Sequence, residues 1–306
     1  MIDPKLKVLQ MVDRYGGVTA AAEVMGYTPS AVSYQLRQLA EQLGVKLIEP
    51  SGRGIQLTPA ARTVLRHTVV MQAQWEQARS ELAATAEEPT GSFTLCGFST
   101  AATHLLPPAA AALRDRYVRL TVRLVEAEPV RCFELLLAGE ADLGLVVVTS
   151  DSPPLSDDRF DQQPLLDDPL DLIVPADHPL AGQKRVTLAD AAREPWILGT
   201  PGSTYHQLVV GVCMSAGFTP HFAHQADEWE TGQAMVAQGL GVILVPRLAR
   251  INTGWPVERV PLWGEPAPAR RILAATRNGA ARHPVVAQAL DLIKTTSSGL
   301  FPPGRR

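Results

Sequence analysis

Residues 29–43 carry two stripes of side chains with helical spacing. The apolar stripe consists of Val32, Leu36, Leu39 and Leu43. The polar stripe consists of Ser30, Ser33, Tyr34 and Arg37. At about 100° per residue, the two stripes are centred roughly 140° apart on a helix. The pattern therefore predicts a helix that buries one face and presents the other to a partner.

The ends of this helix follow from its flanking residues. Thr28 is a suitable N-cap, Pro29 fits the first helical position, and Gly44 can close the last turn. A shorter, alanine-rich helix is predicted over 19–25, with Gly26 at the turn between the two. This arrangement is typical of a helix-turn-helix, so we expect Thr28, Pro29 and the polar stripe to contact DNA. A buried helical hairpin without a DNA role shares most of these features.

A short β-hairpin is predicted directly after this helix. Its strands contain the apolar residues Val45, Leu47, Ile55 and Leu57. A Gly-rich turn, Ser51-Gly52-Arg53-Gly54, joins the strands and places Arg53 at the tip. Such a hairpin forms the wing of a winged helix-turn-helix, which makes Arg53 a further candidate for contact with DNA.

Three segments together give a specific resemblance to a known family. They are AVSYQL in the second helix, the pattern GV-L-E-SGR-I-LTPA around the hairpin, and GSFTLCGFSTAATHLLPP from residue 91. With them the chain resembles the LysR-type transcriptional regulators from about residue 6 to residue 292. The resemblance implies an α+β multidomain protein. Its parts would be a winged helix-turn-helix (1–58), a linker helix that dimerises with its twin (59–90), and a two-lobed α/β effector-binding domain similar to periplasmic binding proteins (91–294).

The predicted DNA-binding domain departs from the family pattern in its charge. Pro50, Gly54 and Gln56 stand where relatives often carry arginine, and Tyr34 stands where arginine or glutamine is common. Residues 1–60 contain six basic and five acidic side chains, which leaves a net charge of only +1. Because affinity for DNA comes largely from neutralised phosphates, we expect weak binding per monomer and dependence on a homodimer or homotetramer.

Residues 58–88 are predicted to form one long helix. Its apolar and small side chains recur at alternating intervals of three and four residues, the repeat of a coiled-coil seam: Ala61, Val64, Thr68, Met71, Trp75, Ala78 and Leu82. Such a helix spans about 45 Å and cannot cover this stripe against a domain of about 60 residues. We therefore expect two chains to pair along it and to read a partly palindromic promoter site. The alternative is a helix packed on its own chain.

From Gly91 onward, predicted strands alternate with predicted helices, which indicates an α/β domain with a mainly parallel sheet. The expected strands are 93–97, 120–126, 142–148, 171–174, 196–198, 221–225, 241–245 and 271–276. The expected helices are 105–116, 130–138, 205–216, 228–237 and 284–294. Two strands would cross between lobe 1 (about 91–148 and 271–294) and lobe 2 (about 165–268) and leave a cleft.

Ligand sites of open parallel sheets lie beyond the carboxyl ends of the strands. In lobe 1 this position holds Ser99, Thr100 and Ala101. In lobe 2 it holds Gly199, Thr200, Gly202, Ser203 and Thr204. Their hydroxyl and N–H groups would suit a small anion such as a carboxylate, with Asp227, Trp229 and Pro246 as further lining, whereas Asp227 and Glu228 could instead select an amine. The serines and threonines could also simply cap helices.

Composition narrows the setting of the protein. The chain has 306 residues, of which 46% are hydrophobic and 19% charged, as in ordinary globular proteins. No apolar run reaches the roughly 18–20 residues of a membrane span and the N-terminus is unlike a signal peptide, so we expect no membrane association and a cytoplasmic location. A net charge of −3 requires any attraction to DNA to be local. The tail 295–306 is expected to be disordered.

Other classes of function receive little support. Cys96, Cys132 and Cys213 lie far apart without a metal-binding spacing, so we expect buried thiols, no metal and no redox pair. Residues 97–101 nearly match the G-x-S-x-G nucleophile motif, but the last position is alanine, so no enzyme is predicted. Gly239-Leu240-Gly241 precedes a strand, so no dinucleotide cofactor is predicted either. A solute-binding receptor is the remaining alternative, but it leaves residues 1–88 without a role.

Overall fold

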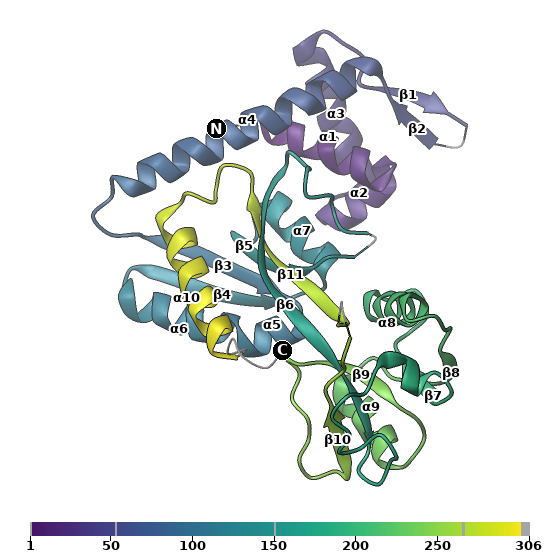
Figure 1. Cartoon of the computed structure of the whole chain (residues 1–306). Helices are drawn as coiled ribbons and strands as arrows, with labels where there is room; N and C mark the ends of the chain where they lie inside the picture. The colour runs from purple at the N-terminus through teal and green to yellow at the C-terminus, as the bar shows by residue number, and fades with distance from the viewer. Residues whose placement is uncertain (1, 53, 150, 265–266, 301–306) are drawn as a thin grey trace.

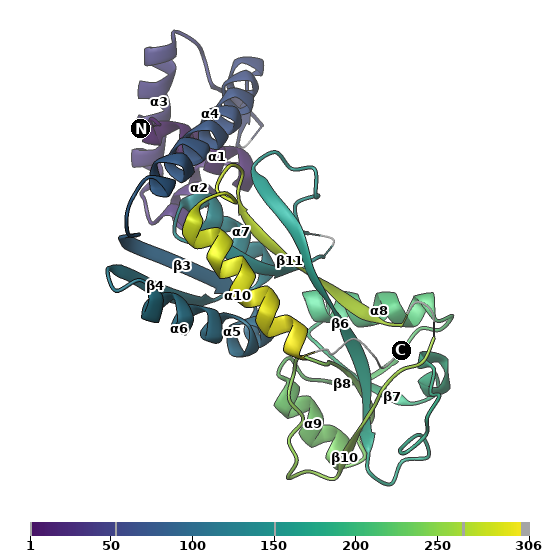
Figure 2. The same ribbon diagram turned by 60° about the vertical axis from the view of Figure 1, so that its left-hand side comes forward.

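The structure is a computed structural model that describes residues 2–52, 54–149, 151–264 and 267–300. It has an N-terminal helical domain, a long helix and a two-lobed α/β region (Figure 1). The helical domain and the long helix lie against one lobe, and the second lobe is at the opposite end of the molecule (Figures 1 and 2). Among the described residues, no helix is both long and apolar enough to cross a membrane.

The N-terminal domain has the predicted helix-turn-helix and wing. It comprises α1 (Pro4–Tyr15), α2 (Val18–Met25), α3 (Pro29–Leu43), β1 (Ile48–Ser51) and β2 (Gly54–Leu57). The Thr28 hydroxyl accepts a hydrogen bond from the N–H of Ala31, and Gly44 ends α3 with a φ of 65°, as its neighbours in sequence predicted. Val32, Leu36 and Leu39 are buried, but Leu43 is 46% exposed, so its expected place in the core is wrong.

The long helix α4 (Pro59–Ala84) ends four residues earlier than predicted. Its expected seam is divided between two environments. Ala61 and Thr68 are fully buried and Val64 packs on the core of the N-terminal domain. Met71, Trp75 and Leu82 are exposed by 45%, 42% and 65%. One part of the stripe therefore packs on its own chain, the alternative weighed above, and the other part lies open.

Lobe 1 is an α/β layer with helices on both faces of its sheet. It contains β3 (Gly91–Gly97), α5 (Ser99–His104), α6 (Leu106–Arg116), β4 (Leu120–Glu126), α7 (Pro129–Ala138), β5 (Leu143–Val147) and α10 (Pro284–Leu300). Strand β3 pairs in parallel with β4 and β5. Because α10 continues to Leu300, the expected disorder of the tail is wrong for residues 295–300, while 301–306 lie outside the described residues.

Two long strands, β6 (Phe160–Pro175) and β11 (Ala269–Arg277), run antiparallel between the lobes, as the two predicted crossing strands require (Figure 2). The start of β6 was not predicted, because its sequence FDQQPLLDDP lacks a regular apolar pattern. β11 also pairs antiparallel with β5, and β6 pairs antiparallel with β9 (Ile243–Pro246) and β10 (Val257–Val260). The sheet is therefore mixed, and the expectation of a mainly parallel sheet is wrong.

Lobe 2 packs its remaining elements around β6, β9 and β10. These elements are the 3₁₀ helix η1 (Leu188–Ala191), β7 (Pro195–Leu198), α8 (Thr204–Ser215), β8 (His221–Gln225) and α9 (Trp229–Ala237). Strands β7 and β8 form a separate parallel pair. Trp196 is fully buried and its indole N–H donates to the Ala191 carbonyl at 3.1 Å, so the largest core side chain also satisfies its polar atom.

Candidate functional site

The polar face of α3 lies open to solvent. Ser30, Tyr34 and Arg37 are exposed, Ser33 is half-buried, and Tyr34 retains 56% of its accessible surface. The Tyr34 hydroxyl accepts a hydrogen bond from the Gln38 amide at 2.7 Å, which orients the ring along the helix. This face is therefore available to the edges of bases in a major groove. Arg53, predicted at the tip of the wing, lies outside the described residues.

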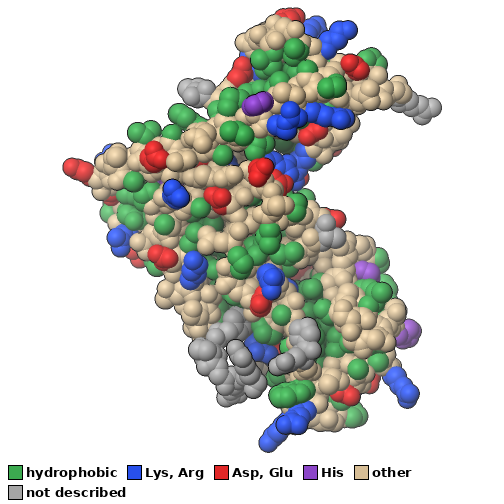
Figure 3. Space-filling view, turned by 45° about the horizontal axis from the view of Figure 1, so that its top comes forward, with side chains coloured by type: hydrophobic (Ala, Val, Ile, Leu, Met, Phe, Trp, Pro, Cys, Tyr) green, Lys and Arg blue, Asp and Glu red, His purple; other side chains and the backbone are tan. Residues whose placement is uncertain are grey.

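Half of the positive charge counted in residues 1–60 is engaged within the chain. The Lys7 ammonium donates to the Ala138 carbonyl at 2.7 Å, Arg14 lies 3.7 Å from Glu134, and Lys5 pairs with Asp3 at 3.4 Å. Arg37 and Lys46 remain exposed. On the face in Figure 3, lysine and arginine side chains are interspersed with aspartate and glutamate. The electrostatic attraction of one domain for DNA is correspondingly small.

Arg62 and Arg66 add positive charge just beyond the 60-residue window of the sequence count. Both are exposed on the first turns of α4, which follows the wing directly. Arg66 donates to the Thr63 hydroxyl at 3.2 Å. They are candidates for phosphate contact that the sequence analysis did not single out, although their position next to the wing was already visible in the sequence.

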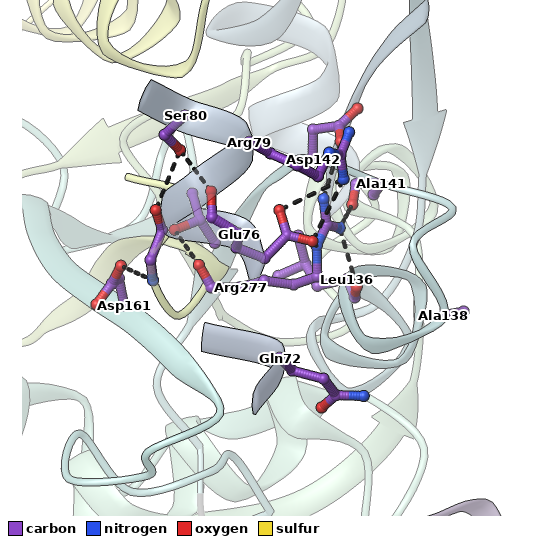
Figure 4. Close-up of polar contacts among 12 residues, drawn as sticks. Gln72, Glu76, Arg79, Ser80, Leu136, Ala138, Ala141, Asp142, Asp161 and Arg277 are labelled. Carbon is purple, nitrogen blue, oxygen red and sulfur yellow. Dashed lines mark hydrogen bonds and ion pairs between the residues drawn. The ribbon is translucent and has the colours of Figure 1, made fainter. Parts of the chain in front are cut away.

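Contacts of α1 and α4 attach the N-terminal part of the chain to lobe 1. Arg277 of β11 is the centre of these contacts: its Nε donates to Glu76 of α4 at 3.0 Å and its Nη2 donates to Asp142 at 3.1 Å (Figure 4). Its Nη1 donates to the carbonyls of Leu136 and Ala141 at the end of α7. One guanidinium therefore joins the linker helix, a strand and a helix C-terminus.

Gly279 brings α4 close to the loop after β11. The Ser80 hydroxyl donates to the Gly279 carbonyl at 3.1 Å. A Cβ atom on Gly279 would lie 2.4 Å from the Ala73 carbonyl oxygen, and the φ of this residue is +87°. Only glycine fits both the space and the backbone conformation. Beside these contacts, a groove of about 870 Å³ separates α1 and α4 from lobe 1, so a few residues carry the attachment.

A cavity of about 170 Å³ lies between the two lobes. Six of the predicted effector-binding residues line it: Ser99, Thr100, Thr204, Asp227, Trp229 and Pro246. Ser99 and Thr100 begin α5 directly after β3, and Thr204 begins α8 after β7, so the cavity is at the carboxyl ends of strands from both lobes. The fold thus brings together residues that are more than 100 positions apart in sequence.

The other five predicted effector-binding residues, Ala101, Gly199, Thr200, Gly202 and Ser203, are not among the residues that line this cavity. Ala101 is buried in the lobe 1 core. The N–H and hydroxyl of Thr200 donate to the two Asp227 oxygens at 2.6 and 2.7 Å, which holds the pKa of Asp227 below its usual range. The Ser203 hydroxyl caps α8 by accepting from the N–H of His206, while Gly202 turns the chain with a φ of +86°. At Gly199 a Cβ would lie 3.0 Å from both the Ser203 hydroxyl and the Tyr205 ring, so a larger residue here would crowd these two side chains.

Arg270 is a lining residue that the sequence analysis missed. It is 7% exposed, its Nε and Nη2 approach one carboxylate oxygen of fully buried Asp168 at 2.9 and 2.8 Å, and its Nη2 also donates to the Thr100 hydroxyl. Its guanidinium lies 4.8 Å from the centre of the Phe98 ring. Burial raises the pKa of Asp168 and lowers that of Arg270 despite their attraction. Asp168 and Arg270 are opposite each other on β6 and β11, a pairing that only the strand register could have revealed.

Four carboxylates complete the lining: Glu126, Glu128, Asp227 and Glu228. In lobe 1, Glu126 is the last residue of β4 and Glu128 precedes α7, and in lobe 2 the other two precede α9. Burial and the like charges of Glu126 and Glu228 raise the pKa of Glu128, while Arg270 lowers it. Acidic groups of the two lobes therefore interact across the cavity.

The thiols and metal-binding groups form no further site in the described residues. Cys96, Cys132 and Cys213 are all fully buried. The neighbouring Cys96 thiol and burial raise the pKa of Cys132, and burial raises that of Cys213 to about 12. No group of three His, Cys, Asp or Glu side chains in the described ranges is placed to hold a metal ion.

A winged helix-turn-helix joined by a long helix to two lobes that enclose a cavity is the architecture of a ligand-responsive transcriptional regulator. Residues 4–62 match the family model described as bacterial regulatory helix-turn-helix protein, lysR family. Residues 86–298 match the model of the LysR substrate binding domain. The chain belongs to the LysR family, whose members are DNA-binding transcriptional regulators.

Relatives and solved structures agree with this assignment. The chain is 30% identical over 270 residues to the hydrogen peroxide-inducible genes activator of Dickeya chrysanthemi, covering 85% of this chain and 84% of that protein. It is 26% identical over 260 residues to the uncharacterized regulator YybE of Bacillus subtilis, covering 82% and 87%. A variant of full-length OxyR from Pseudomonas aeruginosa has the same fold, with a TM-score of 0.64 at 23% identity and 96% and 95% coverage.

Proposed function

We propose that this protein controls transcription by binding promoter DNA as a dimer or tetramer whose geometry responds to a small molecule between its lobes. The observation that carries the proposal is the cavity lined by both lobes at the carboxyl ends of their strands. Within the described residues, β6 and β11 are the two strands that run from one lobe to the other, and each lobe has its own core, so the angle between the lobes can change without unfolding either core. A ligand that binds one angle more tightly shifts the population toward it.

The contacts of the N-terminal domain indicate how such a shift would reach DNA. Lys7, Arg14, Glu76 and Ser80 all bind residues of lobe 1. Lobe 1 therefore moves together with the DNA-binding domain, and lobe 2 is the part that rotates relative to them. In a dimer, rotation of lobe 2 would alter contacts between chains and hence the spacing of the two recognition helices.

An exposed apolar surface supports assembly through α4. Val70, Met71 and Trp75 are exposed on this helix, and Leu43 is exposed at the end of α3. Between them lies an apolar hollow of about 380 Å³ lined by Leu6, Leu39, Leu43, Val64 and Met71, among others. We propose that the α4 helix of a second chain covers this surface, with Met71, Trp75, Ala78 and Leu82 in the interface. Burial of such a surface between two chains is the usual reason for its presence.

The proposed signal is a small molecule other than peroxide, although the name of one relative refers to hydrogen peroxide. Peroxide oxidises the thiolate form of cysteine, which is found at exposed sites with a lowered pKa. The three thiols here are buried, and the pKa values of Cys132 and Cys213 are raised. We further propose that the protein has no enzymatic activity and works in the cytoplasm, where its DNA is accessible.

The test of DNA binding starts from a binding site selected out of random duplex DNA. Arg37→Ala removes an exposed cation from the polar face of α3, and we expect affinity in mobility-shift titrations to fall by about 1–3 kcal/mol. Arg114→Ala is the matched control, because this side chain is 70% exposed on lobe 1. Equal affinity of wild type and Arg37→Ala at every salt concentration would remove Arg37 from the interface.

The effector site is tested separately by thermal unfolding with a panel of metabolites. A ligand that binds only the folded state stabilises it by an amount set by the ratio of its concentration to its dissociation constant. Ser99→Ala removes a cavity hydroxyl whose loss leaves the core intact, because Ser99 is exposed. A compound that stabilises wild type and Ser99→Ala equally, and does the same for Trp229→Ala, is bound elsewhere.

A further inference from the structure

The charges of the inter-lobe cavity are strongly unbalanced. Among the described residues, its lining contains four carboxylates, Glu126, Glu128, Asp227 and Glu228, and one cationic side chain, Arg270. The positive charge of Arg270 is already matched by Asp168 at 2.8 Å, and its Nη2 also binds Thr100. The cavity that the fold provides for a ligand is therefore a site of net negative charge, and an entering carboxylate would meet repulsion.

Three aromatic rings stand beside these carboxylates. Phe98, Tyr205 and Trp229 all line the cavity. The Tyr205 and Trp229 rings meet edge to face with their centres 4.6 Å apart, and the Tyr205 hydroxyl donates to the Leu244 carbonyl, so both rings are fixed. The negative faces of aromatic rings attract cations, and rings combined with carboxylates are the chemistry that recognises organic ammonium groups.

We propose that the effector is a small organic cation, whose ammonium group is held by Glu128 of lobe 1 and Glu228 of lobe 2 against the rings of Tyr205 and Trp229. This inference rests on the proposed function, because it concerns the ligand of the same cavity. Of the four carboxylates, Asp227 is engaged by Thr200, which leaves the glutamates to bind the ligand.

The same charges explain how a cation would act on the lobes. Glu126 and Glu128 belong to lobe 1 and Glu228 to lobe 2. Burial, together with the repulsion from Glu126 and Glu228 that Arg270 partly offsets, raises the pKa of Glu128. A cation between them replaces this repulsion with two attractions. The arrangement in which the lobes are close then gains more from the ligand than the arrangement in which they are apart, which is the differential affinity that a switch needs.

Three probes of nearly equal size and different charge test the sign of the ligand. Benzylamine is a cation at neutral pH, benzoate an anion, and benzyl alcohol is neutral. We expect calorimetric titration of the full-length protein to show benzylamine binding at least tenfold more tightly than the other two, as expected for charge-assisted hydrogen bonds. Tighter binding of benzoate, or no binding of benzylamine at tens of millimolar, would overturn the proposal.

Charge-neutral variants locate the contact. Glu128→Gln and Glu228→Gln keep the size of the side chains, and each is expected to weaken benzylamine by about tenfold while leaving benzyl alcohol unchanged. Glu140→Gln is the matched control, because Glu140 is 60% exposed on lobe 1 next to Arg131 and does not line the cavity. Unchanged affinity of both cavity variants would overturn the assignment of these glutamates and with it the proposal.

Acidification gives a further readout. Because Glu128 faces Glu126, Glu228 and Arg270 and its pKa is raised, we expect benzylamine affinity to fall as the pH is lowered toward that pKa, and less so in Glu128→Gln. A wild-type affinity that does not fall on acidification would contradict the role of Glu128. Mobility shifts without any probe test DNA binding independently, so a failure of this inference and a failure of the proposed function are distinguishable.

Discussion

Replacement of Arg277 by methionine tests whether one side chain holds the linker helix on lobe 1. The guanidinium is 13% exposed, as is the carboxylate of Glu76, and Asp142 is 25% exposed. Arg277→Met removes the cation that Asp142 and the carbonyls of Leu136 and Ala141 share, and leaves Glu76 with the half-exposed Arg79. Removal of one partner from a largely buried ion pair costs about 3–5 kcal/mol. We expect the free energy of unfolding of lobe 1 to fall by about 3 kcal/mol, because the partners are close enough to the surface to regain some water.

Arg79 supplies the matched control, since it pairs with the same Glu76 carboxylate at 3.3 Å but is 49% exposed. A surface pair with this i, i+3 spacing contributes about 0.5 kcal/mol or less. Urea unfolding followed by far-UV circular dichroism measures both variants. Hydrogen exchange of the α4 amides then shows whether the helix has detached in Arg277→Met. Equal destabilisation by Arg79→Met and Arg277→Met, or unchanged exchange in α4, would refute the idea that burial of Arg277 makes it the principal attachment.

Three further predictions concern separate parts of the structure. Gly279→Ala places a Cβ 2.4 Å from the Ala73 carbonyl at a φ of +87°, so we expect a loss of several kcal/mol in urea unfolding and faster exchange in α4. Gly299→Ala is the control: its Cβ meets no atom within 4 Å and it lies in α10, so it should not destabilise the protein. The thiols should react with a colorimetric disulfide reagent only after denaturation, and rapid reaction of the native protein at pH 8 would contradict the burial of all three. Arg270→Met should lower the free energy of unfolding by about 3–5 kcal/mol, because it leaves buried Asp168 without its cation. The double variant with Asp168→Leu should regain most of that stability. A double variant no more stable than Arg270→Met would show that the pair does not act as a unit.

Local signals in the sequence were sufficient to predict the N-terminal winged helix-turn-helix. Thr28, Pro29 and Gly44 fix the ends of α3 through hydrogen bonds and backbone angles that involve only neighbouring residues. The hairpin register pairs Ser51 with Gly54, the two ends of the Gly-rich segment that the sequence marked as the turn. Such features are predictable because no distant part of the chain decides them.

The residues that were missed depend on long-range contacts. Arg270 and Asp168 are separated by 102 positions and meet only through the register of β6 and β11. The regular stripe of α4 did not reveal that Ala61 and Thr68 pack on their own chain, because periodicity shows a buried face without showing what buries it. The prediction that Leu43 is buried was wrong for a related reason. Leu43 lies on the last turn of α3 and is exposed, whereas Val32 and Leu36, nearer the start and middle of the helix, are buried.

Arg277, Ser80 and Lys7 attach the N-terminal domain and the linker helix to lobe 1, and none of these contacts involves lobe 2. Substitutions in lobe 2 can alter which metabolite is bound, because they leave these contacts of the linker helix unchanged. The protein can then gain a new ligand specificity without any change in how its recognition helices are placed on DNA. Ligand specificity and the spacing of the DNA contacts can therefore change independently of each other, because different parts of the chain determine them.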